Sequence, residues 1–109
     1  MATQVTWHGH AAIGIETGGK NLLFDPYLTG NPAATAKPDA LAPDYILISH
    51  GHNDHIGDAL GIAKRTGTMI ISNFDLIAQD AHAWAERVRK ATQGRTRAVV
   101  LSPGESFSL

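Results

Sequence analysis

The chain has 109 residues, 43% of them hydrophobic and 17% charged, as expected for an ordered globular domain rather than a disordered segment. The formal net charge is −1 at pH 7, and nothing in this balance of charges indicates binding to nucleic acid or to an anionic membrane surface. No cysteine is present, so disulfides and thiolate metal sites are excluded, and any metal must bind to His, Asp, Glu and water.

The amino-terminal third predicts antiparallel strands followed by a loop. Apolar residues alternate with other residues over 5–15 as in half-buried strands, and Gly9 marks a break or bulge between them. The glycine pair 18–19 predicts a hairpin turn, after which residues 20–24 return as the next strand. Residues 29–43 contain three prolines and no periodicity, which indicates a surface loop that borders a substrate cleft.

The centre of the sequence carries a cluster of metal-ligating residues. Residues 45–48 form a short apolar run, typical of a buried strand, and His50, His52, Asp54 and His55 follow it. Extended backbone places residues i and i+2 on one side, so His50 and His52 can aim their imidazoles at one point. Asp54 and His55 come where a helix should begin and therefore project from a rigid element. These ligand types suit zinc, manganese, iron or nickel.

The other histidines and the tryptophans have more ordinary interpretations. His10 lies on a glycine-flanked strand break, where it either lines the site or belongs to the hairpin alone. His8 alternates with it and is expected to be an ordinary surface or hairpin residue. His82 is expected to be solvated, and Trp7 and Trp84 are expected in the core.

The carboxyl-terminal half predicts alternating helices and strands. The predicted elements are a helix from its N-cap Asp54 to Gly67, a strand at 68–72, a helix capped by Ser72 or Asn73 and ended by Gly94, and strands at 98–101 and 106–109. This order indicates an α/β fold (α+β in layer terms) with a mixed β-sheet and helices on one face. We expect one domain over residues 1–109.

Two stretches of the sequence resemble a known family. The run from His50 to His55 matches the H-x-H-x-D-H signature of the metallo-β-lactamase fold superfamily. Residues 5–12 and 24–32, within a similarity over 4–78, resemble the bacterial metal-dependent hydrolases similar to L-ascorbate-6-phosphate lactonase. The resemblance implies an αββα sandwich, of which this chain is the amino-terminal half.

The resemblance also implies roles for the site residues. His50 and His52 would hold one metal, while Asp54 and His55 would help hold a second, most often zinc. Asp54 would also orient a metal-activated water, giving a hydrolase of ester, lactone or phosphoester bonds in a small-molecule substrate. Asp25 would orient the metal ligands by hydrogen bonding to them without binding the metal itself. The alternative is that Asp25 is only a turn residue before Pro26.

The sequence departs from this family in one respect. Full members carry further His and Asp ligands in a second half, whereas no His or Asp follows His82 here. The alternative function is therefore a metal-binding, self-associating half-domain without catalysis of its own. We expect a homodimer, or pairing with a second half-fold, through a sheet face formed by Trp7, Ile13, Ile15, Leu22 and Phe24. No apolar run approaches the roughly 20 residues that span a bilayer. No signal-peptide pattern begins the chain, so a cytoplasmic location is expected.

Overall fold

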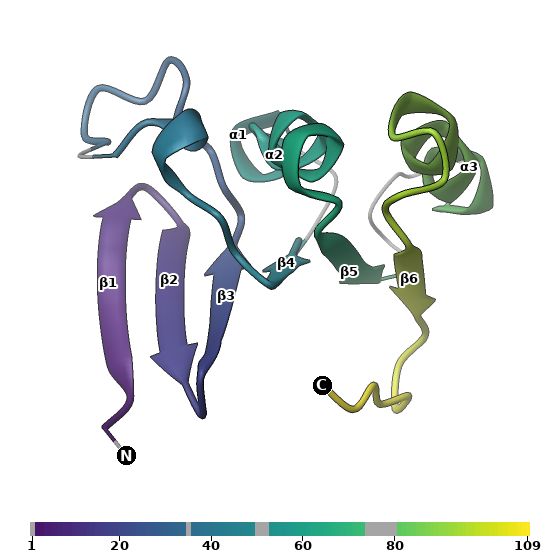
Figure 1. Ribbon diagram of the computed structural model, residues 1–109, viewed down its shortest axis with the longest axis horizontal. Coiled ribbons are helices and arrows are strands. Elements are labelled where there is room, and N and C mark those ends of the chain that lie inside the picture. The colour runs from purple at the N-terminus through teal and green to yellow at the C-terminus, as the bar shows by residue number, and fades with distance from the viewer. Residues whose placement is uncertain (1, 35, 50–52, 74–80) are drawn as a thin grey trace.

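The computed structural model describes residues 2–34, 36–49, 53–73 and 81–109. They form one six-stranded sheet whose strands lie side by side in chain order, from β1 to β6 (Figure 1). The elements are β1 (Gln4–Gly9), β2 (Ala12–Thr17), β3 (Lys20–Phe24), the 3₁₀-helix η1 (Pro38–Ala40), β4 (Tyr45–Leu47), α1 (Asn53–Ile56), α2 (Ala59–Thr66), β5 (Met69–Asn73), α3 (Ala81–Ala91) and β6 (Ala98–Leu101).

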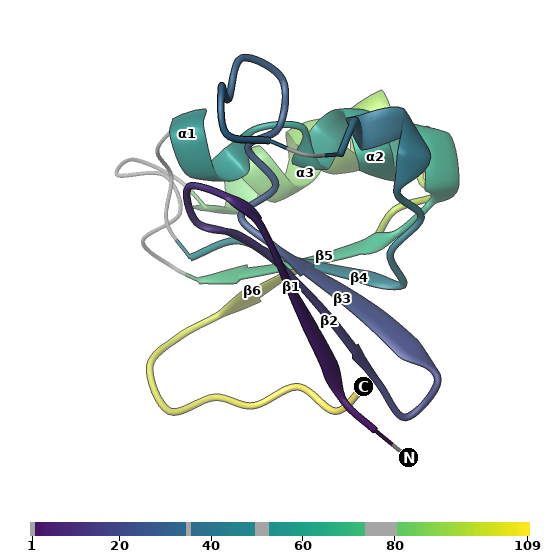
Figure 2. The ribbon, with the colours of Figure 1, turned by 90° about the vertical axis from the view of Figure 1, so that its left-hand side faces the viewer.

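The sheet is mixed, and its two halves differ in direction. Strands β1, β2 and β3 are antiparallel, and the pairing is irregular between Trp7 and Gly9, where the sequence predicts a break. Strands β3 to β6 are parallel. The helices α1, α2 and α3 all lie on one face of the sheet (Figure 2). The predicted α/β fold with a mixed sheet and helices on one face is therefore confirmed.

The core lies between the helices and the parallel half of the sheet. Ile46 and Ile70, from the neighbouring strands β4 and β5, are completely buried against Ile62 of α2. Trp84 and Val88 of α3 pack on the same cluster, so the prediction for Trp84 is confirmed. Burying these aliphatic and aromatic side chains supplies the main stabilisation, roughly 1.5–3 kcal/mol for each fully buried one.

The helix that follows the metal motif is interrupted, which corrects the sequence prediction. Asp54 lies inside α1 rather than at an N-cap, and α1 ends at Ile56. Gly57 then adopts φ +48°, and a second helix, α2, begins after Asp58. Helix α2 ends at Gly67 as predicted, with φ +75°. The interruption has a tertiary cause, because the Asp58 amide donates to the carbonyl of Pro26 instead of continuing one helix.

For the carboxyl-terminal part, one prediction falls outside the described residues and one is corrected. Ser72 and Asn73, the predicted caps of the second helix, end β5, and the start of the helix after them lies outside the described residues, of which Ala81 is the first in α3. Residues 106–109 form no strand, because the chain leaves the sheet after β6 and runs under its open face (Figure 2). In the part of the chain that the structure describes, no helix is long and apolar enough to cross a bilayer.

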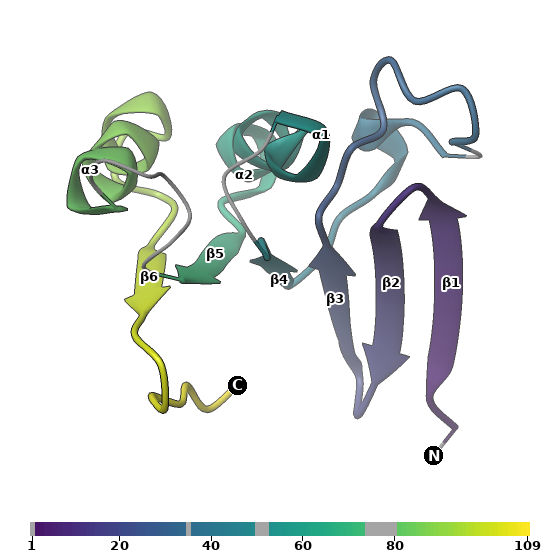
Figure 3. The same ribbon diagram turned by 180° about the vertical axis from the view of Figure 1, so that it is seen from behind.

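On the face of the sheet opposite the helices, the antiparallel strands β1 to β3, which lie side by side in Figure 3, carry apolar side chains. Trp7 lies opposite Ile13, and Ile15 lies opposite Leu22, on this face. Trp7 is 67% exposed and Val5 is 64% exposed, so the prediction that Trp7 belongs to the core is wrong for this chain. The indole Nε1 of Trp7 donates to the carbonyl of His10, which fixes the side chain across the turn after β1.

Candidate metal centre

Asp25 follows directly after β3 and is held in a constrained backbone geometry. Its φ of +43° lies in the left-handed region, which a residue with a side chain occupies at some cost in strain. The Asp25 amide donates to the carbonyl of Leu47 at 2.9 Å, which ties the end of β3 to the end of β4. Asp25 is only 5% exposed, so its carboxylate is buried beside the end of β4, next to Ser49.

The Asp25 carboxylate accepts three hydrogen bonds from groups around that run. Oδ1 accepts from the Ser49 amide at 2.7 Å, and Oδ2 accepts from Ser49 Oγ at 2.6 Å. Oδ2 also lies 3.0 Å from Nδ1 of His55. Because an ionised carboxylate only accepts, Nδ1 of His55 donates, and the ring lone pair is on Nε2, as metal ligation by Nε2 requires. Asp25 thus fixes both the orientation and the tautomer of His55.

The structure brings His10 to the same place. His10 has φ +54° in the turn between β1 and β2. Its ring centroid lies 5.1 Å from that of His55 and 5.6 Å from that of Tyr27, both edge to face. The turn of the first hairpin therefore places the imidazole of His10 next to that of His55, and its role in lining a site stays a prediction.

Asp58 anchors the loop after β3 to the helices, a contact that the sequence predictions do not include. Its carboxylate accepts from the amide of Leu28 at 3.1 Å, from the amide of Thr29 at 2.8 Å and from Thr29 Oγ1 at 2.8 Å. Gly57 makes this approach possible, because a Cβ at residue 57 would lie 2.5 Å from Cα of Tyr27. The Gly57-Asp58 pair is the available sequence signal, since glycine and aspartate together interrupt a helical pattern.

The other predicted ligands fall partly outside the described residues. His50 and His52 lie outside them, as do the side chains of Asp54 and His82. Within residues 2–34, 36–49, 53–73 and 81–109, no group of three or more acidic or histidine side chains forms a metal site. What the structure describes is the supporting layer of the predicted centre, in which a buried carboxylate orients one of the four predicted ligands.

The donor chemistry fits a divalent transition metal. A carboxylate that accepts from Nδ1 of a histidine is the usual support of a metal-ligating imidazole. Ser49, whose amide and hydroxyl both donate to Asp25, directly precedes His50 in the sequence. The supported imidazole and the remaining predicted ligands therefore belong to one short stretch of chain.

A family model described as the metallo-β-lactamase superfamily matches residues 5–107. The chain belongs to this superfamily. This metallo-β-lactamase-fold chain is 42% identical over 93 residues to a UPF0173 metal-dependent hydrolase of Methanopyrus kandleri, covering 85% of the chain and 40% of that protein. It is 49% identical over 74 residues to a UPF0173 metal-dependent hydrolase of Ligilactobacillus salivarius, covering 68% of the chain and 34% of that protein. The chain thus spans well under half the length of these relatives.

Solved structures agree with the metallo-β-lactamase fold. The chain is similar to Igni18, described as a novel metallo hydrolase from the archaeon Ignicoccus hospitalis, with a TM-score of 0.75 and 28% identity. That match covers 98% of this chain and 42% of Igni18. The fold also matches the CmlA β-hydroxylase E377D mutant, with a TM-score of 0.67 at 22% identity, over 99% of this chain and 22% of that one. In both comparisons the chain corresponds to one part of a larger protein.

Proposed function

We propose that the protein acts in metal-dependent hydrolysis of an ester, lactone or phosphoester bond in a small-molecule substrate. The observation that carries the proposal is the part-buried hydrogen bond between the buried Asp25 carboxylate and Nδ1 of His55. It orients one histidine of the H-x-H-x-D-H run in the way that metal-ligating imidazoles are usually supported. The names of the relatives, metal-dependent hydrolases, support the same reaction class.

The proposed metal ligands are His50, His52, Asp54 and His55, with zinc as the first candidate and manganese, iron and nickel as others. When bound, such a metal supplies Lewis-acid polarisation of a substrate oxygen and lowers the pKa of water. Asp54 is proposed to orient the attacking water in addition to binding metal. Asp25 holds His55 in position, and His10, beside His55, borders the space in which substrate would bind.

The test of this function is hydrolysis with and without metal. We expect purified protein to hydrolyse at least one member of a panel of lactones, carboxylic esters and phosphodiesters, to lose that activity on chelation and to regain it with added zinc or manganese. Asp54→Ala should lower turnover by about 100-fold or more, since it removes both a ligand and the water-orienting carboxylate. His82→Ala is the control and should leave turnover unchanged. Activity that survives complete metal removal would exclude the mechanism.

A second proposal, self-association, rests on the open sheet face. Val5 and Trp7 are largely exposed there, beside the half-buried Ile13, Ile15 and Phe24. An exposed apolar patch of this kind is unusual in a monomeric protein. A two-fold symmetric dimer buries the same patch on both copies without any new sequence, so we propose a second copy of this chain as the partner.

Sedimentation equilibrium at micromolar concentration tests this assembly. We expect the wild type to be a dimer, and Trp7→Glu to be a monomer because it places a charge at the centre of the apolar face. Arg87→Glu, on the exposed side of α3, is the matched control and should remain a dimer. A wild-type protein that sediments as a folded monomer contradicts the proposal.

A further inference from the structure

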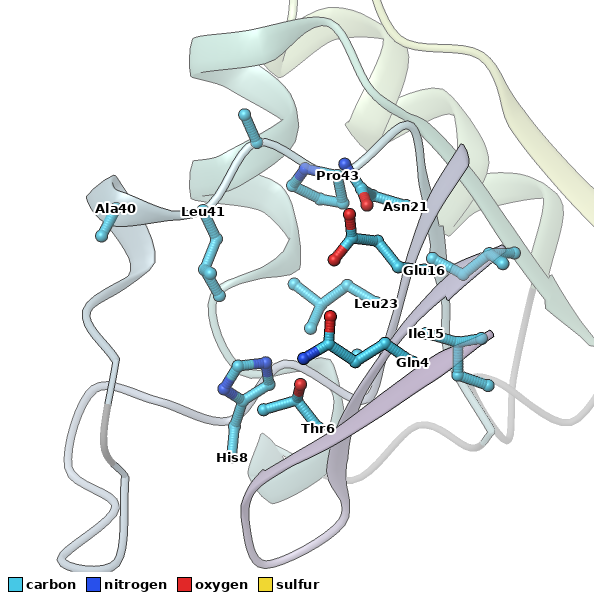
Figure 4. A pocket seen from close by; sticks show the side chains of 13 residues that line it. Gln4, Thr6, His8, Ile15, Glu16, Asn21, Leu23, Ala40, Leu41 and Pro43 are labelled. Carbon is cyan, nitrogen blue, oxygen red and sulfur yellow. The ribbon is translucent and has the colours of Figure 1, made fainter. Parts of the chain in front are cut away.

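A cleft lies on the helix side of the sheet over the antiparallel strands, which the described parts of α1, α2 and α3 leave uncovered. It is bounded by strands β1 to β3 and by residues 40–43, and its volume is about 300 Å³ (Figure 4). Asn21 and Glu16 line one end of it, at the beginning of β3 and the end of β2, whereas Asp25 follows the end of β3. Most of the cleft is therefore separate from the candidate metal centre.

The outer wall of the cleft is held in place by the rest of the fold. Arg65 of α2 donates to the carbonyl of Leu41, and Thr68 Oγ1 donates to the carbonyl of Pro43 at 2.7 Å. The Thr68 contact is buried, and Pro43 is buried as well. Arg65 of α2 and Thr68 thus hold residues 40–43 at a fixed distance from the strands, so the cleft is formed before any ligand binds.

Among the residues that the structure describes, the side chains of Gln4, Thr6 and Glu16 have no hydrogen-bond or ion-pair partner. The Glu16 carboxylate points into the cleft beside the side chains of Gln4 and Thr6 (Figure 4). Within the described parts of the chain, the ion pairs are His55–Asp25 and Arg89–Glu86, so none neutralises Glu16. His8 projects from β1 into the same space, and its Nδ1 is buried with no hydrogen-bond partner.

The arrangement of His8 depends on a neighbouring glycine. Nε2 of His8 lies 3.0 Å from the point that a Cβ on Gly14 would occupy, so the ring lies over bare backbone of β2. His8 lies in β1 of the first hairpin, one of its two expected positions, and it is half-buried and forms one side of the cleft. Leu23 and Leu41 provide an apolar floor and wall between His8 and Glu16 (Figure 4).

We propose that this cleft binds a small organic ammonium compound, with its cation against the Glu16 carboxylate and its apolar body against Leu23 and Leu41. The lining contains one carboxylate and no lysine or arginine, so its charge favours a cation and disfavours an anion. Gln4, Thr6 and the imidazole of His8 offer hydrogen-bond partners for a polar group on the ligand. The volume is at the small end of ligand pockets, which suits a compound of one ring.

The probe for this site is benzylamine, which combines a primary ammonium group with one apolar ring. We expect it to shift the backbone amide resonances of Thr6, Glu16 and Leu41 saturably in two-dimensional nitrogen–proton NMR spectra. Benzyl alcohol and benzoate are matched probes with the same ring and a neutral or an anionic head. Both should bind more weakly, because neither pairs with Glu16.

Variants then assign the binding to the cleft. Glu16→Gln should weaken benzylamine binding by about fivefold, the effect of one solvent-exposed charge pair, and should bring it to the level of benzyl alcohol. Glu86→Gln, which removes an exposed carboxylate on α3 outside the cleft, is the control and should bind as the wild type does. Binding should persist after chelation of metal, which separates this site from the hydrolase proposal. Equal binding of all three probes, an unaffected Glu16→Gln protein, or shifts confined to other residues would overturn the proposal.

Discussion

Replacing His50 and His52 together by alanine should weaken the binding of zinc or manganese by about 100-fold or more. These two imidazoles lie at i, i+2 in the motif and are expected to hold the same ion, so removing both leaves at most Asp54 and His55 as protein ligands. Isothermal titration calorimetry on the metal-free proteins measures the change. His82→Ala, which removes a histidine outside the motif, is the control and should bind as the wild type does.

Asp25→Asn tests the supporting layer with a smaller expected effect. The amide keeps the size of the carboxylate but removes the charge that favours Nδ1–H donation by His55, so metal affinity should fall by about 10-fold to 100-fold. Asp39→Asn, an exposed residue of η1, is the matched control and should bind metal normally. If the double histidine variant binds metal as tightly as the wild type, the assignment of the ligands is wrong.

Gly57→Ala should destabilise the fold by about 3 kcal/mol or more. The added Cβ would overlap the carbonyl oxygen of Pro26 and would lie 2.5 Å from Cα of Tyr27. Both neighbours are backbone atoms, which cannot rotate away, and the φ of +48° adds strain of its own for alanine. Urea unfolding followed by circular dichroism measures the loss.

Gly61→Ala is the matched control for this substitution. Gly61 lies in α2, and nothing comes within 4 Å of the position of its Cβ. Alanine should therefore stabilise α2 by roughly 0.5–1 kcal/mol through helix propensity. A Gly57→Ala protein with wild-type stability would show that the helix junction does not close on the loop after β3 in solution.

Local patterns predict most of the sheet and the helix end at Gly67. Alternation over residues 5–15, a glycine pair and three apolar runs correspond to observed strands, because strand patterning repeats every two residues. The break at Gly57 is not local, because Asp58 takes its partners from Thr29, which is 29 residues away. The pattern of residues 54–66 favours one continuous helix, but hydrogen bonds to residues far away in the sequence interrupt it.

For the candidate site, the sequence predicts a set of metal ligands but not the contacts that support them. The sequence alone predicts that the motif from His50 to His55 is a set of metal ligands, because these residue types at this spacing have few other uses. The pairing of Asp25 with His55 joins residues 30 apart, and only the family resemblance implied a supporting role for Asp25. Trp7 was misplaced because an apolar residue on an alternating strand gives no information about whether the other side of its sheet is covered.

The chain-order arrangement of the six strands has a consequence for how the molecule folds. Every strand pairs with the one that precedes it, so no pairing requires a later strand to insert between two earlier ones. Topologies with such sequence-local pairing fold faster than those that close long loops first. During synthesis the hairpins of β1 to β3 can form on the ribosome and then act as the template for β4, β5 and β6 in turn. Asp25 lies at the end of β3, so it belongs to the part of the sheet that needs no later strand to form, and β4 then brings Leu47 and Ser49 to it.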